Sequence, residues 1–157
     1  MEKVRMAGTA DVSELVRLRG VMFGDIAERE SGSDEWRRHA KEMLQARLDE
    51  ESPNLVAFVV DREDRPGALA SCAVGAVDYR LGGPDNVSGK TGYIFNVATD
   101  PDQRRRGFSR SCMAALIDWY RSRGIRTVDL RASPEGEPLY RALGFARTSH
   151  PAMRLRL

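Results

Sequence analysis

The sequence predicts one α/β (α+β) domain over residues 1–157, with a mixed, mostly antiparallel central sheet and helices on both faces. A chain of 157 residues, 41% of them hydrophobic, is long enough for one core and too short for two ordinary ones. Two runs rich in β-branched residues, 55–60 and 68–79, flank a Pro-Gly turn and indicate an antiparallel hairpin. Strand, helix and strand then alternate in the second half, an order typical of a parallel crossover.

The first third of the chain predicts one strand and two helices. A short strand is expected at 4–6, and apolar residues then recur at helical spacing over 11–24. Asp11 and Glu14 resemble a capping box at the start of that helix. A polar, acidic loop follows and leads to a second helix near 34–50, which ends before a proline.

The second half predicts the remaining elements. The short apolar run 93–98 is typical of a buried strand, and 127–130 is a further short strand. The helix expected over 107–123 carries its apolar residues on one face and ends at a glycine. A short helix at 136–143 and one or two final strands within 145–157 complete a sheet of six to seven strands with about four helices.

Composition and charge exclude several classes of protein. The 25 basic and 23 acidic residues leave a net charge of +2, which is too balanced for a nucleic-acid binder. No apolar run reaches the roughly 20 residues of a membrane helix, so we expect a soluble, cytoplasmic protein. Cys72 and Cys112 have no second Cys or His at metal-ligand spacing, so neither a disulfide framework nor a metal site is expected.

The most informative segment, 97–109, leads from a strand through three arginines into a helix. A helix start leaves backbone N–H groups unpaired, and Gly107 lets a ligand approach the backbone closely. These features predict a pyrophosphate cradle, although a surface turn with solvated arginines fits the bare pattern too. The segment lacks the Lys-Ser/Thr of a P-loop and the G-x-G-x-x-G of a dinucleotide fold, which disfavours nucleoside triphosphates and NAD.

A second segment, 131–145, leads from a strand end into a short helix that carries Tyr140. The helix is followed by Gly144 and Phe145. Taken alone, this tyrosine is either a half-buried helix residue or a proton donor.

Together and in this order, the two segments resemble the Gcn5-related N-acetyltransferase (GNAT) superfamily. The family's loop pattern Q/R-x-x-G-x-G/A matches residues 104–109, except that Ser109 takes the last position. The later pattern N-x-x-A-x-x-L-Y-x-x-x-G-F is met at Leu139, Tyr140, Gly144 and Phe145, with Ser133 and Gly136 in place of Asn and Ala.

The resemblance implies a GNAT fold splayed between strands 4 and 5, with acetyl-CoA as co-substrate and no metal. Backbone groups of the fourth strand would bind the pantetheine amides, and the loop with the helix start would bind the pyrophosphate. The cofactor-binding residues implied in this way are Val97, Ala98, Thr99, Arg104, Arg105, Arg106, Gly107, Phe108, Ser109 and Ser133.

The resemblance also implies a reaction, the direct attack of a neutral amine on the thioester. A backbone N–H near Val97 or Ala98 would stabilise the developing oxyanion, and Tyr140 would be the general acid for the leaving thiolate. Asn96 either orients a water or the amine, or only satisfies backbone groups.

The acidic loop resembles the family's substrate-facing wall. Its Glu28 and Glu30, with Asp34 and Glu35 nearby, would attract a cationic acceptor or relay its proton; a solvated loop is the alternative.

These observations favour an N-acetyltransferase that acts on a primary amine of a small molecule or a protein. The alternative is a GNAT-like module without catalysis, which binds CoA or nothing and serves regulation or assembly. Neither nucleic acid nor membrane is expected as a partner, whereas a homodimer is possible. Surface roles are expected for His39 and His150, and a core position for Cys112.

Overall fold

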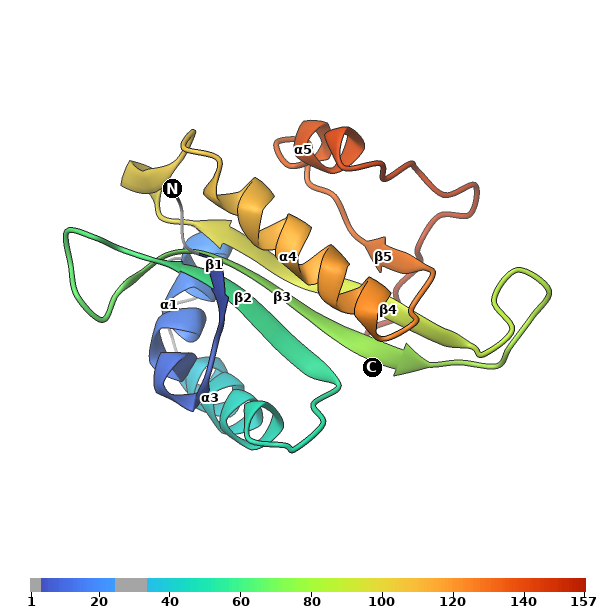
Figure 1. The fold of residues 1–157 in the computed structure, drawn as a ribbon, viewed down its shortest axis with the longest axis horizontal. Coiled ribbons are helices and arrows are strands. Elements are labelled where there is room, and N and C mark those ends of the chain that lie inside the picture. The colour runs from blue at the N-terminus through green and yellow to red at the C-terminus, as the bar shows by residue number, and fades with distance from the viewer. Residues whose placement is uncertain (1–3, 25–33) are drawn as a thin grey trace.

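The computed structural model describes residues 4–24 and 34–157. One sheet in the order β1-β2-β3-β4-β5 runs through the molecule (Figure 1). Its strands are β1 (Val4–Met6), β2 (Leu55–Asp61), β3 (Leu69–Tyr79), β4 (Lys90–Thr99) and β5 (Val128–Leu130). The first four are antiparallel neighbours, and β5 pairs with β4 in parallel, as the predicted crossover requires.

Helices cover both faces of this sheet, so its central strands are buried on both sides. The elements are α1 (Val12–Phe23), α3 (Glu35–Leu48), α4 (Phe108–Ser122), α5 (Glu137–Ala142) and the short 3-10 turns η1 (Thr9–Asp11) and η2 (Pro101–Gln103). One hydrophobic core lies under α1 and α3, and a second lies under α4 on the opposite face (Figure 1). The predicted α/β class and mixed sheet are therefore confirmed. None of the described helices is long and apolar enough to span a bilayer.

The sheet is splayed where β4 and β5 separate. Their parallel pairing covers only three residues of β4, from Gly92 to Ile94. The opposite edge of β4 stays paired with β3 up to Thr99, but this pairing contains a bulge. Ile94 pairs with Gly75, whereas Asn96, two residues further along β4, pairs with Val74, which directly precedes Gly75 in β3. One extra residue therefore stands in β4, directly beyond the last pair with β5.

This bulge changes which backbone groups face the open edge. Before it, the Gly92 N–H donates to Thr127 O at 2.9 Å, on the β5 side. Beyond it, the Asp100 N–H donates to Ala70 O at 2.9 Å, on the β3 side. Because N–H directions alternate along a strand, the N–H of Val97 faces the edge that β5 leaves open.

Two predictions about local structure are wrong. The described residues 145–157 form no strand, so the described sheet has five strands where six to seven were predicted. Met153 and Leu155 of this tail are 91% and 81% exposed. Alternating apolar residues specify a strand only where a paired edge and a covering layer are available, and this tail has neither. The predicted capping box of Asp11 and Glu14 does not form at the start of α1. The Asp11 carboxylate instead accepts the Gly8 N–H at 2.9 Å, and Glu14 accepts the Leu69 N–H at 2.8 Å.

Candidate active site

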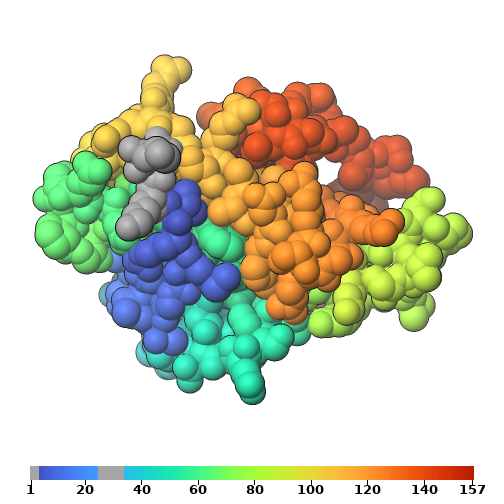
Figure 2. Space-filling model, in the orientation of Figure 1, coloured from blue at the N-terminus to red at the C-terminus, as the bar shows by residue number. Residues whose placement is uncertain are grey.

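A groove of about 630 Å³ lies where the open edge of β4 meets the start of α4 and the segment around α5. Figure 2 shows the surfaces of α4 and the α5 segment, in orange and red, next to each other. The groove brings together most of the residues that the sequence singled out. These are Val97, Ala98, Thr99, Arg104, Arg105, Gly107, Phe108, Ser109, Ser133 and Tyr140.

The first wall of the groove is the end of β4. Val97 is half-buried, and its N–H faces the open edge as described above. The hydroxyl of Thr99 lies 2.7 Å from that of Ser71 and 2.6 Å from that of Ser109, which links β3, β4 and α4. These hydroxyl contacts hold the end of β4 against the first turn of α4.

The second wall is the arginine loop, which we define as residues 104–107. Arg105 and Gly107 both have left-handed backbone conformations, with φ of 63° and 82°. Two such residues in close succession turn the chain sharply, so that α4 begins with its N–H groups at the groove. The side chain of Arg104 stays close to β4, because its Nε donates to Thr99 O at 3.3 Å.

The third wall carries Tyr140, which is half-buried and packs edge-on against Phe145 at 6.1 Å between ring centroids. Burial raises the pKa of this phenol above its usual value. Within the described parts of the chain its hydroxyl has no hydrogen-bond partner, so it is available to a ligand in the groove. Ser133 caps the neighbouring turn, where its Oγ accepts the Gly136 N–H at 3.1 Å.

Two predicted site residues lie beside the groove and do not line it. Asn96 is 3% exposed, accepts a hydrogen bond from Arg19 at 3.4 Å and donates to Cys72 Sγ at 3.6 Å. This placement favours the interpretation that Asn96 satisfies neighbouring polar groups. Arg106 turns back along its own loop, donating to Gln103 at 2.8 Å and lying over the Phe108 ring at 4.9 Å.

Among the remaining sequence candidates that the structure describes, His39, His150 and Cys112 do not line the groove. Glu28 and Glu30 fall outside the described residues. His39 and His150 are exposed, and the former lies 3.7 Å from Glu35. Cys112 is fully buried in the core under α4, where the sequence placed it.

Sequence reasoning missed several groove residues. Val21 and Met22 reach the groove from α1, and Gln103 reaches it from η2. The α1 pair reads as ordinary helix residues, and no local signal connects it with a loop about 80 residues away. Only the packing of α1 against the sheet brings it to the site.

The residues of the groove fit an extended ligand with amides along one part and phosphates at one end. The open edge of β4 offers backbone hydrogen-bonding groups, the complement of amides. The helix start and two exposed arginines, Arg104 and Arg105, suit phosphate oxygens. Acetyl-CoA has this arrangement of groups, with the thioester beyond the pantetheine amides.

Comparison with known proteins agrees with the groove. Residues 22–145 match the model of the acetyltransferase (GNAT) family. The [ribosomal protein bS18]-alanine N-acetyltransferase of Escherichia coli K12 is 42% identical over 55 residues, 33% of this chain and 37% of that protein. The mycothiol acetyltransferase of Cellulomonas flavigena is 34% identical over 94 residues, 57% of this chain and 27% of that protein. The matches thus span about a third of these curated relatives.

Solved structures resemble the whole chain. A predicted acetyltransferase from Clostridium acetobutylicum, solved with acetyl-CoA, has a TM-score of 0.83 at 24% identity and covers 99% of this chain and 96% of its own. A GCN5-related N-acetyltransferase from Ralstonia eutropha has a TM-score of 0.79 at 25% identity, covering 99% of both chains. An aminoglycoside N-acetyltransferase in complex with CoA has a TM-score of 0.71 at 19% identity, covering 99% of this chain and 95% of its own.

The family model matches most of the chain, and the fold and groove described above have the features on which the sequence resemblance depended. This chain belongs to the acetyltransferase (GNAT) family, whose enzymes use acetyl-CoA as co-substrate.

Proposed function

We propose that this protein transfers an acetyl group from acetyl-CoA to a primary amine of a small molecule or a protein, by direct attack of the amine on the thioester. One observation carries the proposal: the open edge of β4, the arginine loop and Tyr140 all line the same groove. A surface turn with solvated arginines would not need the other two walls.

In this proposal the groove binds the donor by its backbone as much as by its side chains. The end of β4, at Val97 to Thr99, binds the pantetheine amides, and Ser133 contributes a hydroxyl beside them. The arginine loop and the first turn of α4 bind the pyrophosphate, with Arg104 and Arg105 closest. Arg106 supports the loop through Gln103.

The chemistry follows from the same geometry. The amine nitrogen attacks the carbonyl carbon, the carbon–sulfur bond breaks, and the nitrogen loses a proton to water. The Val97 N–H stabilises the charge that develops on the carbonyl oxygen, since the N–H of Ala98 faces β3. Tyr140 gives its proton to the departing thiolate, and the phenolate then takes a proton back from water. Among the described residues its hydroxyl has no hydrogen-bond partner, which favours that role.

The acceptor is proposed to be cationic, because Glu28 and Glu30 lie in the chain segment between α1 and α3. The relatives suggest where a screen should begin. One acetylates the alanine of a ribosomal protein, and another acts on aminoglycosides, so N-terminal peptides, aminoglycosides and polyamines are tested first. The homodimer and the cytoplasmic location stay predictions.

The deciding experiment is a calorimetric titration with acetyl-CoA, with ATP as the comparison, followed by the amine screen. We expect binding of acetyl-CoA and not of ATP, because ATP lacks the pantetheine arm. Gly107→Val should abolish binding, since a β-branched residue is strained at a φ of 82°. Gly124→Val is the matched control: Gly124 has a φ of 73° at the other end of α4, away from the groove.

Each outcome decides one part of the proposal. Full affinity in Gly107→Val would show that the phosphates bind elsewhere. Binding of acetyl-CoA without acetylation of any amine would instead favour the non-catalytic CoA-binding module.

A further inference from the structure

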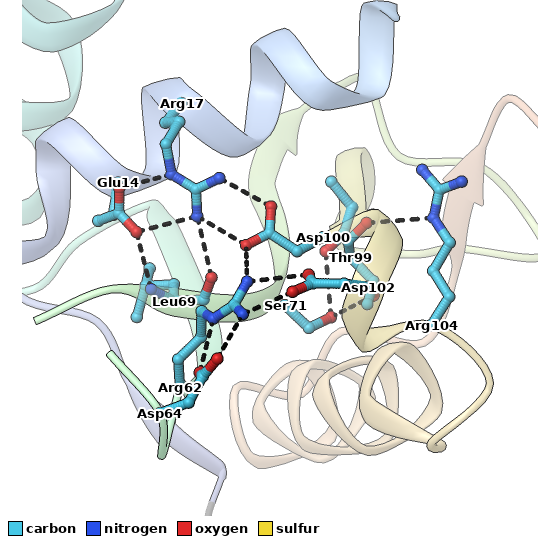
Figure 3. Close-up of polar contacts among 11 residues, drawn as sticks. Glu14, Arg17, Arg62, Asp64, Leu69, Ser71, Thr99, Asp100, Asp102 and Arg104 are labelled. Atoms are coloured by element: carbon cyan, nitrogen blue, oxygen red, sulfur yellow. Dashed lines mark hydrogen bonds and ion pairs between the residues drawn. The ribbon is translucent and has the colours of Figure 1, made fainter. Parts of the chain in front are cut away.

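A buried arginine, Arg62, lies in the turn that follows β2, next to Asp100 and Asp102 (Figure 3). Only 2% of the Arg62 side chain is exposed. Its Nε and Nη2 donate to Asp64 at 2.9 and 2.8 Å, and Nη1 and Nη2 donate to Asp102 at 2.9 and 2.7 Å. Nη1 also donates to Asp100 at 2.9 Å, so all five N–H groups of the guanidinium are used.

Two of these carboxylates belong to the segment that leads into the arginine loop. Asp100 directly precedes η2, and Asp102 lies within it. The Asp100 carboxylate also accepts two hydrogen bonds from Arg17 of α1, at 2.7 and 3.0 Å. The turn is therefore held from two directions, by α1 and by the β2–β3 turn (Figure 3).

Gln103 connects this turn with the groove. Its N–H donates to Asp100 O at 2.9 Å, and its Oε1 accepts a hydrogen bond from Arg106 at 2.8 Å. Gln103 and Arg104 both line the groove. The position of η2 therefore sets where the arginine loop begins.

The network around Arg62 contains more negative than positive charges. Two guanidiniums, of Arg17 and Arg62, face four carboxylates, of Glu14, Asp64, Asp100 and Asp102. Without Arg62, the carboxylate of Asp102 would lose the guanidinium that compensates it, and that of Asp100 would share Arg17 with Glu14. They would repel phosphate groups and compete with them for the loop arginines.

We propose that Arg62 is a positioning residue for the acetyl-CoA pyrophosphate: it fixes and neutralises Asp100 and Asp102, so that the arginine loop is presented to the groove. This inference rests on the proposed function of the loop. Arg62 itself does not line the groove, and it acts through η2. A lysine could not replace it fully, because an ammonium has three donors and no planar fork for two carboxylates.

The test compares the affinities of the Arg62→Met and Arg62→Lys proteins for acetyl-CoA and for pantetheine, which lacks phosphates. We expect Arg62→Met to lose about 10-fold or more in acetyl-CoA affinity, as small displacements of a binding element do, and Arg62→Lys to lose less. Affinity for pantetheine, measured by ligand-detected NMR, should be unchanged in both. A purely structural defect would weaken both ligands together and would overturn the inference.

A control variant at another paired arginine tests whether any effect is specific to Arg62. Arg5 also forms paired hydrogen bonds with two carboxylates, Asp11 and Asp61, but neither belongs to η2. Arg5→Met should therefore bind acetyl-CoA within about 2-fold of the native protein, since distant sites act independently. If Arg62→Met does not fold, the same two affinities measured for Arg62→Lys decide whether the positioning role is right.

The Gly107→Val protein separates the two proposals. If it loses acetyl-CoA while both Arg62 variants stay within about 2-fold of the native affinity, the positioning role is wrong and the loop assignment stands. If Gly107→Val itself keeps full affinity, the arginine loop does not bind the pyrophosphate, and the positioning role of Arg62 is wrong together with it.

Discussion

At the scale of single residues, the environment of Tyr140 limits how it can act. An unperturbed phenol has a pKa near 10 and a free thiol near 8.5, so proton transfer to the thiolate is uphill by roughly 2 kcal/mol. Burial raises the pKa of Tyr140 further, so the difference in pKa between the phenol and the thiol becomes larger. The transfer becomes favourable only where the thiolate is itself poorly solvated.

Tyr140→Phe should lower kcat by about 10-fold or more, because general acid catalysis typically contributes 10²–10⁴-fold. Affinity for acetyl-CoA should be nearly unchanged, since the ring remains in place. Steady-state kinetics with the acceptor found in the screen, together with calorimetry, measures both. Tyr79→Phe is the control, because Tyr79 is 64% exposed on β3 and outside the groove. An unchanged kcat in Tyr140→Phe would remove Tyr140 from the mechanism.

At the scale of secondary structure elements, α4 packs on the sheet through Tyr120 and two glycines. Tyr120 is 1% exposed, and its hydroxyl donates to Ala76 O of β3 at 2.9 Å. A Cβ on Gly92 of β4 would lie only 2.7 Å from Cε1 of this ring, and Gly75 of β3 leaves room for the ring in the same way. The glycines let the helix lie close to the point where β4 and β5 separate.

Gly92→Ala should therefore destabilise the protein by about 1–3 kcal/mol, the usual cost of overpacking a core. Urea denaturation followed by circular dichroism measures this change in the free energy of unfolding. Gly83→Ala is the matched control, because a Cβ there meets no atom of the described residues within 4 Å. Equal stability of the two variants would show that Tyr120 moves aside without cost.

At the scale of the whole molecule, ion pairs join segments that are distant in sequence. Hydrogen bonds from Arg62 lower the pKa of Asp64 to about 2, and they lower that of Asp102. Burial opposes the shift at Asp100, but hydrogen bonds from Arg17 and Arg62 outweigh it, so its pKa is lowered as well. These carboxylates are ionised in the folded protein at pH values where the unfolded chain already binds protons.

This difference gives stability a defined dependence on pH. A carboxylate with a lowered folded pKa stabilises the fold above its unfolded pKa, near 4, and this contribution is lost as the pH falls through the folded value. The free energy of unfolding should therefore decrease between about pH 4 and pH 2. Denaturation at several pH values in this range measures the slope.

Arg62→Met should make that slope shallower, because its partner carboxylates return toward their ordinary pKa values. Arg121→Met is the control, since Arg121 pairs with Asp118 on the surface, where both side chains are 73% exposed. Equal slopes for the native and Arg62→Met proteins would contradict the role of this network in acid stability.

The sequence by itself determined the fold class, the order of the elements up to α5, and the strand, loop and helix that form two walls of the groove. These features depend on apolar periodicity and on residues such as Gly107, whose effects are local. The local pattern left Tyr140 open between a half-buried helix residue and a proton donor, and the general-acid role came from the family resemblance.

Only the tertiary structure decided the remaining features. The number of strands depended on whether residues 145–157 meet a paired edge, and the open edge of β4 depended on where β5 ends. Arg62 reads in the sequence as one charged turn residue among many, and its role follows from Asp100, 38 positions away. Burial and pairing of this kind are set by contacts between distant segments, and local patterns carry no record of them.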